Sequence, residues 1–150
     1  MRLYLYIVDN DLNDFLDPES HVYIGDNMKL FILNENGTKV EIVRNFFRDT
    51  YANLPYHKFA YPFPFTSTGG ESIVYVLYPD KSEDEIRTFT SYDISRRLEK
   101  VWINEVLVFD NDDIYYNPDY YIWSEPTKDY FVPKYGISHV VIKKDFNTEL

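Results

Sequence analysis

The 150-residue chain has the length of one domain, and its 45% hydrophobic content is enough for a buried core. The formal net charge of −10 disfavours direct binding to nucleic acid or to anionic membranes, and it favours basic partners or cations. The absence of cysteine excludes disulfides and thiolate metal sites, and no apolar run is long enough to span a bilayer.

Residue usage favours β-structure. Ala occurs only at Ala52 and Ala60 and Gln is absent, while Asn, Asp, Ile, Phe and Tyr are frequent. Losing the best helix former while gaining aromatic and β-branched residues favours sheet. The same bias is typical of A/T-rich genomes, such as those of many phages. The first residues become charged too soon for a secretory signal, so we expect a cytoplasmic protein, in the host cytoplasm if it is viral.

Strand patterns follow one another along the chain. Leu3, Leu5 and Ile7 alternate with Tyr4, Tyr6 and Val8 in the first predicted strand, and residues 21–25 form a short second one. Residues 28–33 and 39–43 flank Asn36-Gly37, a pair that accepts the positive φ of a tight hairpin. Residues 72–78, 105–109 and 136–144 are further strands, the first of them apolar on both faces.

One helix is predicted, at about residues 91–103. Thr90 and Asp93 have the spacing of a capping box, with Asp in place of Glu. Ile94, Leu98 and Val101 fall on one stripe of a helix. We therefore predict a single α+β domain over residues 1–150, a mainly antiparallel β-sheet with one main helix packed on it.

The acidic residues are concentrated in two stretches, each free of basic residues and each following a predicted strand. The first contains Asp9, Asp11 and Asp14, and the second contains Asp110, Asp112, Asp113, Asp119 and Glu125. Loops at strand ends expose side chains for binding, so both stretches are candidate surfaces.

Metal binding is the first interpretation of such Asp-rich loops. Asp9, Asp11 and Asn13 have the alternating oxygen spacing of a calcium loop, but Asp14 replaces the sharp-turn Gly and Ser20 replaces the closing Glu. Two-metal hydrolase or nuclease chemistry needs a further distant acid, and it is kept as an alternative. We assign no metal ligand and no cofactor.

Catalytic motifs are weak. His21, His57 and His139 are isolated, no Gly-x-Ser-x-Gly elbow is present, and the Gly69-Gly70 pair lacks the Lys of a phosphate-binding loop. We therefore predict no catalytic residue and expect a protein without enzymatic activity.

Large rings accompany the second acidic stretch. Tyr116, Tyr120 and Trp123 are the residue types that anchor protein interfaces, while carboxylates steer the approach of a basic surface. The sequence favours an acidic protein that docks on a basic, nucleic-acid-handling protein, as an inhibitor or DNA mimic. An anti-restriction or anti-CRISPR factor of a phage and an immunity protein are examples. A structural virion or oligomer component, or a homodimer, is the other alternative.

Overall fold

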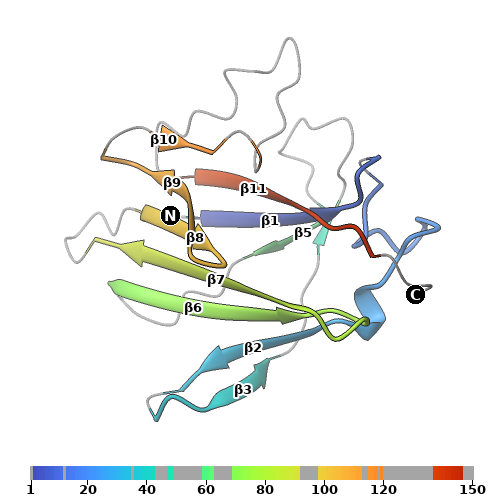
Figure 1. Cartoon of the computed structure of the whole chain (residues 1–150), viewed down its shortest axis with the longest axis horizontal. Helices are drawn as coiled ribbons and strands as arrows, with labels where there is room; N and C mark the ends of the chain where they lie inside the picture. The colour runs from blue at the N-terminus through green and yellow to red at the C-terminus, as the bar shows by residue number, and fades with distance from the viewer. Residues whose placement is uncertain are drawn as a thin grey trace.

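The computed structural model describes residues 2–11, 13–34, 36–42, 47–48, 59–62, 69–91, 98–112, 115–117, 119 and 137–146, which build two β-sheets (Figure 1). The four-stranded sheet has the order β11 (Ile137–Lys143), β1 (Arg2–Val8), β5 (Phe59–Pro62) and β4 (Phe47–Arg48). The seven-stranded sheet has the order β10 (Tyr115–Tyr116), β9 (Val106–Asp110), β8 (Leu98–Ile103), β7 (Glu83–Thr90), β6 (Gly70–Leu77), β2 (Lys29–Leu33) and β3 (Lys39–Ile42).

The predicted α+β class and its main helix at about 91–103 are wrong. The described part of that segment, Leu98–Ile103, is strand β8, and no α-helix occurs in the described residues. Leu98, Val101 and Ile103 are buried on the core side of β8, because a register shift opposite Phe89 and Thr90 places an extra residue in the strand. The three-residue spacing from Leu98 to Val101 therefore comes from a β-bulge.

The first strand is found as predicted, but both of its faces are buried. β1 lies between β11 and β5, and its residues Leu5 to Val8 are all buried. It pairs in parallel with β11, whereas the other pairs of the two sheets are antiparallel. Because this pairing is parallel and aligns Val8 with Lys143, it places the segment after β11 beside the connection after β1.

Three hairpins show how turn residues set the seven-stranded sheet. The predicted Asn36-Gly37 turn joins β2 to β3, with Gly37 at φ 77°. Asn104 and Glu105 join β8 to β9 with φ 50° and 68°, the backbone of a two-residue turn that matches strand twist. Lys81 at φ 73° lies in the turn between β6 and β7.

One core joins the two sheets. Leu5, Ile7 and Val140 of the four-stranded sheet belong to the same buried cluster as Val74 and Ile86 of the seven-stranded sheet. Phe15, Leu16, Ile24 and Met28 of the connection after β1 join it. Residues 21–25, predicted as a strand, instead form turns that lead into a 3-10 turn at Gly25–Asn27. The core thereby fixes the acidic connection against one end of the sheets.

Candidate functional site

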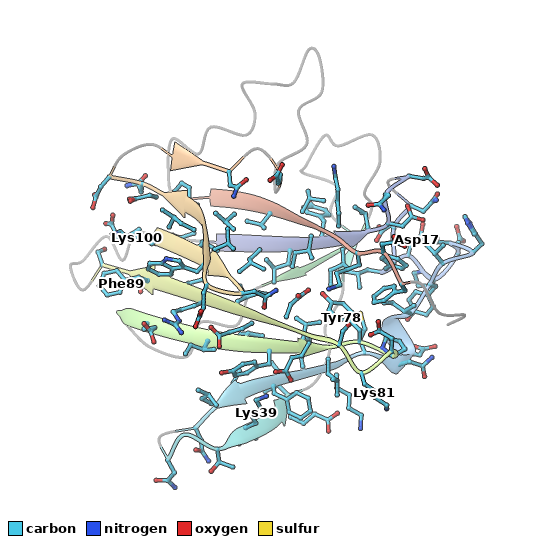
Figure 2. All side chains as sticks on the ribbon, viewed as in Figure 1. Asp17, Lys39, Tyr78, Lys81, Phe89 and Lys100 are labelled. Atoms are coloured by element: carbon cyan, nitrogen blue, oxygen red, sulfur yellow. The ribbon has the colours of Figure 1, made fainter. Side chains whose placement is uncertain are left out.

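The two acidic stretches lie at opposite ends of the molecule. The connection after β1 lies beyond one end of the sheets, where Figure 2 labels Asp17, and the end of β9 lies at the other, near Lys100. Both stretches follow strand ends, as expected, but they do not form one continuous acidic surface.

Asp9 closes its own loop. Its Oδ1 accepts hydrogen bonds from the backbone N–H groups of Asp11 (2.9 Å) and Asn13 (2.8 Å), and its Oδ2 accepts one from Asn13 Nδ2 (2.9 Å). Both carboxylate oxygens are thus used within the loop, an arrangement that explains the alternating oxygen spacing without a metal. Asp11 is exposed, whereas Asp14 is buried and accepts a hydrogen bond from the backbone of Leu16 (2.8 Å).

The second acidic stretch likewise contains both buried and exposed carboxylates. Asp110 is buried, accepts a hydrogen bond from the backbone of Asp112 (3.1 Å) and lies 3.9 Å from Lys100 Nζ. Asp112 and Asp119 are exposed. Tyr116 lies in β10, opposite Phe109. The predictions for Asp113, Tyr120, Trp123 and Glu125 fall outside the described residues.

A pocket of about 440 Å³ opens at the first end. We call it the acidic pocket. Its lining comes from the connection after β1 and from the segment after β11: Asp9, Asn10, Asp11, Phe15, His21, Val22, Tyr23, Ile24, Lys144, Asp145 and Phe146. Three acidic residues and three aromatic residues thus line one space, a combination suited to a cationic group.

Lys144 contributes little positive charge to the acidic pocket, because its ammonium binds elsewhere. Its Nζ lies 3.3 Å from Oδ2 of the buried Asp84 and 4.7 Å from the centre of the Tyr78 ring. Asp84 also accepts hydrogen bonds from Tyr78 Oη (2.7 Å) and Asn104 Nδ2 (2.8 Å). Burial, and then the charge of Asp84, raise the pKa of Tyr78 well above its usual value, so this hydroxyl stays a donor.

The aromatic wall of the pocket is held by packing. Phe146 meets Phe15 edge to face, with ring centres 5.1 Å apart, and lies 5.4 Å from the Tyr78 ring. The Tyr23 ring lies over Gly25, where an added Cβ would come within 2.6 Å of it, and its hydroxyl donates to Asp26 (3.0 Å). Gly25 is therefore needed for the close approach of this ring.

A shallower hollow of about 450 Å³ accompanies the second acidic stretch. It is lined by Phe89, Ser91, Glu99, Lys100, Trp102 and Asp112, on the face of β7 and β8 that points away from the core. It places the predicted Asp112 beside two rings. Trp102 was not predicted as a binding residue, because the sequence pattern places it in the helix predicted at about 91–103, and Phe89 has no local signal that marks it as one.

The rings of the acidic pocket were also missed. Phe15 and Tyr23 follow Asp9 and Asp11 in the sequence, so their proximity was available as a signal. Phe146 and Asp145 belong to the other end of the chain, and only the parallel pairing of β1 with β11 brings them to this loop.

Cation-binding clusters and similarities to known proteins give no further assignment. Within the described ranges, no group of three or more His, Asp or Glu side chains could hold a metal ion. No family model, no curated protein and no solved structure matches the chain. Among the helical segments that the structure describes, none is long and apolar enough to cross a membrane.

Proposed function

We propose that this protein is a non-enzymatic acidic binding protein that docks on a basic surface of a protein partner. The acidic pocket receives a basic side chain of that partner, and the remaining exposed carboxylates steer its approach. The observation that carries the proposal is the pocket itself, in which Asp9, Asp11 and Asp145 share one space with Phe15, Tyr23 and Phe146.

The chemistry of the pocket favours a guanidinium or ammonium group. Carboxylates accept charge-assisted hydrogen bonds from such a group, and aromatic faces attract it through their quadrupole. The lining ammonium of Lys144 is bound to Asp84, so it does not neutralise the pocket carboxylates. An anionic ligand would face repulsion at the same place.

The net charge of −10 favours partners with extended basic surfaces. Proteins that bind nucleic acid carry such surfaces, because they must neutralise phosphates. We therefore propose that the partner handles nucleic acid and that this protein inhibits it by occupying the nucleic-acid site. Asp112, which is exposed, provides steering charge at the second end, and the exposed Asp119 lies beyond β10.

Binding of a fluorescent oligo-arginine peptide tests the pocket directly. The double variant Asp11→Asn/Asp145→Asn keeps both side-chain shapes and removes two exposed charges. We expect its dissociation constant to rise about thirtyfold, since two charge-assisted contacts of about 1 kcal/mol each are lost. The matched control is Glu71→Gln/Glu105→Gln, which removes two exposed charges outside the pocket and should change binding less than about twofold.

Equal weakening by the two double variants would show that net charge alone drives binding and would refute the role of the pocket. The inhibitory role is tested on a partner purified from the source cells. Duplex DNA should displace that partner from the wild-type protein, and capture should weaken as the salt concentration rises. A captured partner that binds DNA and this protein simultaneously would contradict inhibition at the nucleic-acid site.

A further inference from the structure

Strand β3 ends the seven-stranded sheet with an exposed edge. It is the last strand in the sheet order, and in the described part of the chain no strand pairs with its outer side (Figure 1). Lys39, Val40 and Glu41 are exposed, and Val40 retains 42% of its accessible surface. An open edge of this kind offers unpaired backbone groups to another strand.

The alternation of hydrogen-bonded and non-bonded positions in the β2–β3 hairpin shows which backbone N–H and C=O groups of β3 point away from β2. The backbone N–H of Asn34 donates to the carbonyl of Thr38 (2.9 Å). In an antiparallel pair, bonded and non-bonded positions alternate, so Val40 and Ile42 point their N–H and C=O groups toward β2. The backbone groups of Lys39 and Glu41 therefore point outward.

The side chains of β3 are divided between the two faces of the sheet. Val40 lies opposite Ile32, and Ile42 lies opposite Leu30, on the core side. Lys39, labelled in Figure 2, and Glu41 lie on the outer face, where Lys39 Nζ contacts Glu83 (2.9 Å) and the Tyr75 ring (4.1 Å). The edge thus carries opposite charges on one face and an exposed apolar side chain on the other.

We propose that a second copy of this chain pairs with this edge, β3 against β3 in antiparallel orientation, with a two-fold axis at Val40. Lys39 then lies opposite the partner's Glu41, and Glu41 lies opposite the partner's Lys39. Each of these pairs exchanges two N–H···O bonds, because their backbone groups are the ones that point outward. Val40 lies against the partner's Val40 and extends the apolar row of the core face.

Among two-fold axes at Lys39, Val40 or Glu41, charge and hydrogen-bond phase together select the one at Val40. An axis at Glu41 sets two carboxylates opposite each other, and an axis at Lys39 sets two ammonium groups opposite each other, both of which are destabilising. A shift by a single residue sets outward groups against inward ones and breaks the hydrogen bonding. Charged edge strands usually prevent association, but in this register the charges of Lys39 and Glu41 complement those of a second copy.

A cross-linking experiment tests the geometry, since the chain contains no cysteine. In the proposed dimer, Val40 faces the partner's Val40 at a non-hydrogen-bonded position, where Cα atoms lie about 4.5 Å apart, within disulfide range. Under mild oxidation, Val40→Cys should form covalent dimers at least about tenfold faster than Val106→Cys, a control at another exposed valine (48% accessible). Equal rates for the two variants would overturn the proposal.

Charge variants test the register without a disulfide. In sedimentation velocity over a hundredfold range of concentration, the wild-type chain should dimerise, and Glu41→Lys and Lys39→Glu should each shift the dimer dissociation constant upward by about tenfold. An equal mixture of these two variants should dimerise again, because each Lys then faces a Glu. Glu105→Lys, at an exposed turn position, should behave like the wild type.

Monomers at every concentration of the wild type would overturn the proposal. So would a mixture of Glu41→Lys and Lys39→Glu that stays monomeric after each has lost dimerisation. Because neither variant touches the acidic pocket, oligo-arginine binding is independent of these results.

Discussion

Asp84 connects the segments that meet inside the molecule at the end of the sheets that carries the acidic pocket. Its carboxylate is buried and joins four segments: Tyr78 after β6, its own strand β7, Asn104 in the β8–β9 turn, and Lys144 after β11. A buried charge is tolerated only when it is paired and fully hydrogen-bonded. The ammonium of Lys144 is thus fixed away from the acidic pocket by a residue that does not line the pocket.

Replacing Tyr78 by Phe removes one hydrogen bond to this carboxylate. We expect a loss of about 1–2 kcal/mol in the free energy of unfolding near pH 7, because a buried acceptor loses a donor while Lys144 and Asn104 remain. The difference in the free energy of unfolding between the wild type and Tyr78→Phe should then become smaller as the pH rises. Burial and the charge of Asp84 raise the pKa of Tyr78 in the folded state above its unfolded value of 10.0.

The direction of this pH dependence follows from the pH at which the folded and the unfolded states each lose the Tyr78 proton. Below pH 10 the hydroxyl is protonated in both states, so its contribution is fully present. As pH rises above 10, the unfolded state loses this proton first, and folding becomes less favourable until the folded-state pKa is passed. Urea unfolding of both proteins from pH 8 to 11 measures the difference, and the shared lysines and other tyrosines cancel. A constant difference across this range would contradict the hydrogen-bonded geometry of Tyr78.

Single-residue roles were only partly accessible from the sequence. The spacing of Asp9, Asp11 and Asp14 indicated an acidic loop, but it could not distinguish the exposed Asp11 from Asp14, which is buried against the backbone. Asp110 was predicted as a steering charge on the same basis and is buried beside Lys100. Burial depends on neighbours from distant segments, and local composition contains no such information.

At the scale of elements, strands and hairpins were more predictable than the helix. The Asn36-Gly37 turn and the strands at 106–110 and 137–143 have strong local signals, and the structure confirms them. The predicted helix failed because the bulge in β8 interrupts the two-residue alternation and imitates a helical stripe. Tertiary pairing with β7 and β9 decides the outcome there.

One substitution in the β8–β9 turn is expected to stabilise the protein, whereas most substitutions destabilise a protein. Glu105 has φ 68°, a left-handed conformation that costs an ordinary residue about 1 kcal/mol and costs Gly almost nothing. Its side chain is exposed, so little packing is lost. Glu105→Gly creates the Asn-Gly pair that this turn type prefers and should raise the free energy of unfolding by about 0.5–1 kcal/mol.

Thermal and urea unfolding measure this change, and Glu105→Ala is the matched control. Ala removes the same charge but keeps the Cβ, so it should not stabilise the protein. Equal stabilisation by Ala and Gly would assign the effect to charge removal and not to backbone strain.

At the scale of the whole molecule, the acidic pocket gathers the carboxylates of Asp9, Asp11 and Asp145 at one end of the sheets. The pairing of β1 with β11 adds Asp145 to the acidic connection after β1. The sequence showed two acidic stretches, but the long-range pairing that assembles the acidic pocket had no local signal. Composition therefore predicted the character of the surface, while topology determined which residues share a site.

This charge distribution predicts that salt stabilises the fold. The chain has 25 acidic and 15 basic residues, so screening removes more repulsion than attraction. Ion pairs such as the exposed Lys39–Glu83 and the partly buried Arg87–Glu85 oppose the effect, but a surface pair contributes only about 0.2–1 kcal/mol. Raising NaCl from 0.02 to 0.5 M should therefore increase the free energy of unfolding by about 1–2 kcal/mol, which corresponds to about 3–6 °C in Tm.

KCl should act equally if the cause is screening, and Asp11→Asn/Asp145→Asn should reduce the gain because two of the repelling charges are gone. A Tm that falls with salt would show that the ion pairs outweigh the repulsion. The acidic ends would then lack the net carboxylate repulsion that a basic partner is proposed to relieve.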